Sequence, residues 1–146
     1  MGDLVRRLIT HVTAVSVALG LASAGPGAAL GMLMGEAGKA TIVHSGSLEF
    51  RVVNRLDANE ISHFVVFTEN KDGSELKLGS EYRTEKDVYH VEPKSFVIPE
   101  IRFKPGNERR SIRVCIRSTD AEGNPPASGY IIRMCSRAVV FMGRGN

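Results

Sequence analysis

The sequence predicts an all-β protein: an immunoglobulin-like antiparallel β-sandwich of about seven short strands, preceded by a signal peptide. After residue 38, short β-prone runs alternate with turn signals about every 8 to 12 residues. No stretch there shows a sustained apolar helical stripe. The chain has 146 residues, which is room for one ordinary domain. We therefore expect a signal peptide over 1–24, a flexible segment over 25–38 and the sandwich over 39–146.

The first 24 residues have the three parts of an export signal. Arg6 and Arg7 form a basic start, residues 8–21 are apolar and uncharged, and Ala22-Ser23-Ala24 suits a signal peptidase. A membrane anchor is the alternative, because no charged side chain occurs from position 8 to 35. Pro26 interrupts that run, so we expect a cleaved signal, a periplasmic or secreted protein and no stable membrane span in the mature chain.

Residues 25–38 are rich in Gly, Ala, Leu and Met, without a clear helix or strand pattern. We expect a mobile segment there. An alternative follows from Leu30, Met32 and Met34, which alternate along the chain. That alternation would let the segment add itself as a strand to a neighbouring molecule.

The first clear strand of the domain covers residues 47–54, where Leu48, Phe50 and Val52 alternate. The run over 61–68 is apolar on both faces, which indicates a central strand or an interface. Asn70-Lys71-Asp72-Gly73 then predicts a tight hairpin turn, because Asp-Gly supplies the positive φ that such turns need.

The central stretch covers residues 95–117. Pro99 cannot donate to a sheet ladder, so the chain must bend or lie at an edge there. Beyond the Pro105-Gly106 turn, Ile112, Val114 and Ile116 alternate with Arg113, Cys115 and Arg117, which predicts a strand with an apolar inner side. Residues 130–141 form the last predicted strand.

Two cysteines, Cys115 and Cys135, favour a disulfide in an exported chain. Both thiols are predicted to face away from the core. They can bond if their strands are neighbours, but not if the strands lie in opposite sheets, because bonded cysteines need Cα atoms within roughly 7 Å. Their spacing does not match a zinc site.

The arginines at alternate positions form two cationic rows, Arg113 with Arg117 and Arg133 with Arg137. One interpretation is a solvated outer face that discourages edge pairing. The other is a site for a carboxylate or an acidic partner, which guanidinium groups bind bidentately.

No catalytic or cofactor motif is present, so we expect a protein that is not an enzyme and uses no cofactor. His44, His63 and His90 stand in separate segments without ligand spacing, which favours surface histidines over a metal site. The formal charge of +3 is scattered and the chain has no Trp, so no nucleic-acid partner is expected.

The sequence over about residues 40–141 resembles the N-terminal immunoglobulin-like domain of periplasmic pilus-assembly chaperones of the chaperone-usher pathway. The resemblance is carried by the strand over 47–54 that ends in Asn54, and by Val97-Ile98-Pro99. Pro105-Gly106 and Ile112-Arg113-Val114 then follow in the family's order.

The resemblance implies a chaperone-like protein that binds pilus subunits, or an usher-like assembly protein, by donor-strand complementation. In that family an Arg and a Lys grip the subunit's C-terminal carboxylate; Lys39 is the nearest cation here. The strand over 130–141 is expected to be the penultimate one, so that the donor strand and second domain are missing. The alternative is a structural or adhesive pilus-type subunit that self-associates and is completed by a neighbour's strand.

Overall fold

The computed structural model describes residues 30–36, 38–44, 46–55 and 60–143. The predicted signal peptide over 1–24 lies outside these residues. The described part is all-β and contains no helix. Its strands are β1 Leu30–Leu33, β2 Thr41–Val43, β3 Ser47–Glu49, β4 Arg51–Asn54, β5 Ser62–Asn70, β6 Tyr82–Thr84, β7 Tyr89–Val91, β8 Phe96–Val97, β9 Glu100–Phe103, β10 Pro105–Thr119 and β11 Arg133–Met142.

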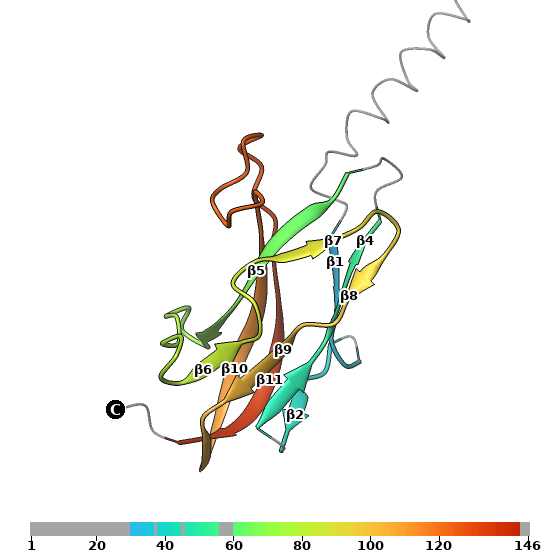
Figure 1. Ribbon diagram of the computed structural model, residues 1–146. Coiled ribbons are helices and arrows are strands. Elements are labelled where there is room, and N and C mark those ends of the chain that lie inside the picture. The colour runs from blue at the N-terminus through green and yellow to red at the C-terminus, as the bar shows by residue number, and fades with distance from the viewer. Residues whose placement is uncertain (1–29, 37, 45, 56–59, 144–146) are drawn as a thin grey trace, which may run out of the picture.

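The strands form two layers (Figure 1). One layer is a five-stranded sheet in the order β2-β11-β10-β5-β7. The other consists of two three-stranded ladders, β1-β4-β8 and β3-β9-β6. These two ladders continue one another. The Phe50 N–H donates to the Pro99 carbonyl at 3.3 Å, at the point where both segments pass from one ladder to the other. The immunoglobulin-like sandwich predicted from the sequence is confirmed.

Pro99 marks the break in the second layer. It follows β8 and precedes β9, so one predicted run becomes two strands in different ladders. This confirms the predicted bend and has a simple cause, since proline cannot donate to a ladder. The hairpin predicted after β5 also forms, because the Gly73 N–H donates to the Asn70 carbonyl at 2.9 Å and Gly73 has a φ of 92°.

The core lies between the two layers and follows the alternation of the strands. Ile112, Val114 and Ile116 of β10 are buried and face residues such as Phe50 and Val52 in the buried core cluster. The inner sides predicted for both strands are therefore confirmed. β10 is the centre of this arrangement, since it pairs antiparallel with β5 on one side and with β11 on the other.

One sequence expectation is corrected by the strand pairing. Residues 30–36 are not a loose segment: β1 pairs antiparallel with β4, and Leu30 and Met34 are buried. This packing compensates for a sequence without a clear strand pattern. Residues 25–29 lie outside the described residues. The predicted penultimate strand, over 130–141, has β2 as its next neighbour in the sheet, and β2 pairs with β11 only at Ala138, Val139 and Val140.

Glu81 and Arg110 connect the turn before β6 to β10. Arg110 donates to the Glu81 carboxylate at 2.7 Å and to the Asn70 side-chain oxygen at 3.0 Å, while the Lys77 N–H donates to Glu81 at 2.8 Å. Burial raises the pKa of the Glu81 carboxyl, but these hydrogen bonds and the nearby positive charges outweigh it and hold the pKa below its usual value.

We expect this interaction to make stability depend on pH. Because the pKa of Glu81 is lower in the folded chain, its contribution is complete above the unfolded-state pKa and is lost as pH falls through the folded-state value. Urea unfolding from pH 6 down to about 3 should show Glu81→Gln about 1 kcal/mol less stable at pH 6 and closer to the parent at pH 3. A constant difference across this range would contradict the assignment.

Candidate functional site

The outer edge of β11 is only partly covered. β2 runs parallel to β11 and pairs with Ala138, Val139 and Val140. The preceding residues, 133–137, have β10 on one side and no paired strand on the other among the residues that the structure describes. We call residues 133–137 the open edge of β11.

The register shows which backbone groups this open edge presents. Cys115 and Cys135 are directly opposite, with Cα atoms 4.1 Å apart. Such a short spacing is typical of a non-hydrogen-bonded pair in an antiparallel ladder. The N–H and C=O groups of Cys135, and by alternation those of Arg133 and Arg137, therefore point away from β10. The Arg137 carbonyl faces the Thr41 N–H of β2, as the parallel pair of Ala138 with Thr41 requires. An incoming strand could pair with the remaining groups.

A hollow of about 360 Å³ lies beside the open edge. We call it the methionine groove, because Met32 and Met34 line it on one side and Met134 on the other. Met34 is buried and Met134 packs against the core, whereas Leu33 is 52% exposed at the groove. The full lining is Met32, Leu33, Met34, Gly35, Glu36, Gly38, Met134, Cys135 and Ser136. The open edge thus combines backbone groups that pair with no other described strand and an adjacent apolar surface.

The outer face of the same strands carries the predicted arginine rows. Arg113 lies opposite Arg137, and Arg117 lies opposite Arg133, across the β10–β11 ladder. Two of them converge on Glu69 of β5, whose side chain is only 1% exposed. Arg113 forms an ion pair with one Glu69 oxygen at 2.9 Å, and Arg133 donates to the other. These two guanidinium groups therefore neutralise a buried carboxylate of the chain itself.

The contacts of the other predicted cations are weaker than the ion pairs with the buried Glu69. The guanidinium groups of Arg117 and Arg133 lie 5.6 and 5.4 Å from the ring centroid of Phe67. Arg137 donates to the Gly38 carbonyl at 3.4 Å, and Lys39 forms an exposed ion pair with Glu36. Arg137 and Lys39 thus both approach the segment at the methionine groove, while Arg113 and Arg117 lie on the neighbouring strand.

Cys115 and Cys135 form a disulfide between β10 and β11. The bond connects the open edge of β11 to the central strand. Glu69 lies within 4.8 Å of both sulfur atoms. This group is a poor metal site, because disulfide sulfurs are not thiolates and Glu69 already pairs with arginines.

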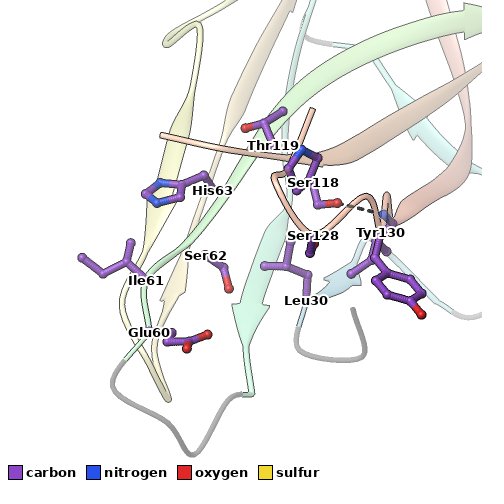
Figure 2. A pocket seen from close by; sticks show the side chains of 11 residues that line it. Leu30, Glu60, Ile61, Ser62, His63, Ser118, Thr119, Ser128 and Tyr130 are labelled. Carbon is purple, nitrogen blue, oxygen red and sulfur yellow. Dashed lines mark hydrogen bonds between the residues drawn. The ribbon is translucent and has the colours of Figure 1, made fainter. Parts of the chain in front are cut away.

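A second hollow, of about 200 Å³, lies at the start of β5, beside Ser62 and His63 (Figure 2). Leu30 lies beside Ser128 on the side of β5 where Ser62 lies, whereas His63 projects from the other side. His63 lies beside His90 of β7, with 4.8 Å between their ring centroids, but His44 stacks on Phe141 instead. The structure thus brings two of the three histidines together, which their separation in sequence did not predict.

Comparison with known proteins gives a likeness of fold. No family model matches the chain, and no curated protein matches it by sequence. Among solved structures it is similar to the YadV chaperone, with a TM-score of 0.54, 11% identity, and coverage of 80% of this chain and 53% of that one.

Two further solved structures, both of chaperones, are similar to this chain in fold. The Escherichia coli chaperone DraB matches with a TM-score of 0.52 and 11% identity, covering 77% of this chain and 54% of that one. The Pseudomonas aeruginosa CupB2 chaperone matches with a TM-score of 0.52 and 14% identity, covering 72% and 54%. The chain has the fold of these chaperones. It spans about half their length, and the likeness agrees with the family resemblance read from the sequence.

Among the described residues, no helix is long and apolar enough to cross a membrane.

We expect the pairing of Arg113 and Arg133 with Glu69 to be essential for stability. Arg113→Met with Arg133→Met should lower the free energy of unfolding by about 3 kcal/mol, because a buried carboxylate would lose both partners. Urea unfolding would measure this loss. Adding Glu69→Met should restore most of the stability, and Arg117→Met alone should cost less than about 1 kcal/mol. A double variant as stable as the parent would show that the two arginines are free for another role.

Proposed function

We propose that this protein is a non-enzymatic, periplasmic chaperone-like protein that binds pilus subunits by β-strand addition during surface-fibre assembly. The observation that carries the proposal is the open edge of β11, beside the methionine groove, in a chain with a chaperone fold. Strand addition needs both of these local features: unpaired backbone groups for affinity and an apolar surface for alternate side chains.

The open edge supplies the backbone part of this binding. A subunit strand would bond to the outward N–H and C=O groups of Arg133 and Cys135 and to the N–H of Arg137, because the Arg137 carbonyl faces the Thr41 N–H of β2 in the parallel register. The β10–β11 ladder and the disulfide hold these groups in an extended conformation before binding. Such preorganisation reduces the conformational entropy that binding would otherwise cost.

The methionine groove supplies the side-chain part. Alternate residues of an added strand would point toward Met32, Leu33 and Met134. Methionine is flexible and polarizable, so it adapts to side chains of different shape. This composition fits a protein that binds several related subunits rather than one fixed sequence.

A carboxylate contact is proposed at the same place. Arg137 donates to the carbonyl of Gly38 at 3.4 Å, and Lys39 forms an exposed ion pair with Glu36. Gly38 and Glu36 both line the groove, so each cation would give up one weak contact to bind a carboxylate beside it. Arg117 remains a second candidate. Arg113 and Arg133 are poorer candidates, because releasing them would strip a buried carboxylate of its partners.

A structural or adhesive subunit that self-associates is the second candidate, since the open edge could equally accept a strand from another copy. The segment expected to act as donor, with Leu30 and Met32, is already paired with β4 in its own chain. Releasing it would expose the buried Leu30 and Met34. The chaperone role therefore has the stronger support.

We expect Leu33→Glu to weaken subunit binding at least about tenfold, because it puts a charge into the groove without disturbing a buried side chain. Native mass spectrometry of the chain, coexpressed with the proteins encoded next to it, would measure the complex. Leu78→Glu is the matched control, since Leu78 is 61% exposed and does not line the groove.

A one-to-one complex that is lost only in Leu33→Glu would support the proposal. Equal binding by both variants would contradict it. A ladder of self-associated species without subunit would favour the structural role instead.

A further inference from the structure

Two histidines meet at the edge of the five-stranded sheet that is farthest from β2. His63 of β5 and His90 of β7 are direct partners in the antiparallel register. Their Nδ1 atoms are 2.6 Å apart, and their rings are nearly perpendicular, at 82°. The close approach involves the same nitrogen of each ring, so each ring has its Nε2 directed elsewhere.

This contact restricts the protonation of the pair. A neutral imidazole has one nitrogen that carries hydrogen and one with a lone pair. Two Nδ1 atoms at this distance can share one hydrogen, whereas two hydrogens between them would collide. If the ring that carries this hydrogen holds it on Nε2 instead, both Nδ1 atoms have lone pairs, and these two lone pairs point toward one another. Such convergence is the arrangement that chelates a metal ion.

We propose that His63 and His90 bind a divalent transition-metal ion of the zinc class through their Nδ1 atoms. In a tetrahedral site, two nitrogens at roughly 2.0–2.1 Å from the metal lie about 3.3 Å apart. The two Nδ1 atoms need to separate by less than about 1 Å to reach this spacing. Because His90 is exposed and β7 is the last strand of its sheet, side-chain rotation can supply the movement.

Acidic side chains follow the C-terminal end of β10, the strand that pairs with β5 at His63. Thr119 of β10 is the register partner of His63, and Asp120 follows it directly. Asp120 accepts hydrogen bonds from the Glu122 and Asn124 N–H groups at 3.0 and 2.8 Å, which fixes its carboxylate. The negative charges of Asp120 and Glu122 both act on His63. Their charge favours a bound cation, but in the described part of the chain no third His, Cys, Asp or Glu ligand atom lies within 4.8 Å of the pair, so water would complete the coordination.

Burial, followed by the charge of His90, lowers the pKa of His63, although Asp120 and Glu122 work in the opposite direction. This edge of the sheet is separate from the open edge of β11, since β10 and β5 lie between them. The inference is therefore independent of the proposed strand addition.

Calorimetric titration of the full chain with zinc chloride at pH 7.5 would test the site. We expect one equivalent of Zn²⁺ to bind, with affinity at least tenfold lower in His63→Gln and in His90→Gln. His44→Gln is the matched control, because His44 stacks on Phe141 away from the pair, and it should bind as the parent does.

Nitrogen NMR of the imidazoles would give a second readout, in which Zn²⁺ shifts the Nδ1 signals of His63 and His90 together. It also shows whether each variant remains folded. No binding by the parent chain, or binding retained in the double variant His63→Gln/His90→Gln, would overturn the proposal.

Discussion

The backbone hydrogen bonds on both sides of β10 hold the larger sheet together. β10 pairs with β5 from Ile112 to Thr119 and with β11 over most of its length, so it presents no free edge there. Buried backbone groups need such partners. Because β10 is paired on both sides, the outer edge on this side of the sheet belongs to β11, where β2 pairs with three residues. The centre of the sheet is therefore fully paired, and we propose that a partner strand binds at the β11 edge rather than at the β7 edge.

Charge on the outer face follows from the same arrangement. β5, β10 and β11 lie side by side, so Glu69, Arg113 and Arg133 meet across three strands. Two guanidinium groups around one buried carboxylate leave the surface cationic while satisfying the buried charge. The disulfide lies beside this cluster and fixes β11 against β10. Electrostatics and covalent bonding therefore both hold the strand whose other side is open.

Local patterns in the sequence predicted the structural features that are set by residues close together along the chain. Alternation identified the buried side of β10, and Pro99 identified the break between β8 and β9. Features set by strand order were not predicted. The alternation of Leu30, Met32 and Met34 suggested a strand donated to another molecule, whereas β1 pairs with β4 of its own chain. Glu69 is charged yet buried, because arginines from other strands reach it. The His63–His90 contact likewise depends on a register between distant segments.

Residue-resolved amide hydrogen exchange of the free chain tests the open edge most directly. The Cys135 and Ser136 amides are adjacent on β11, but the register directs the first outward and the second toward β10. We expect the Cys135 amide to exchange about tenfold faster than that of Ser136, and to become protected when a pilus subunit is added. A Cys135 amide that is already as protected as Ser136 in the free chain would contradict this expectation.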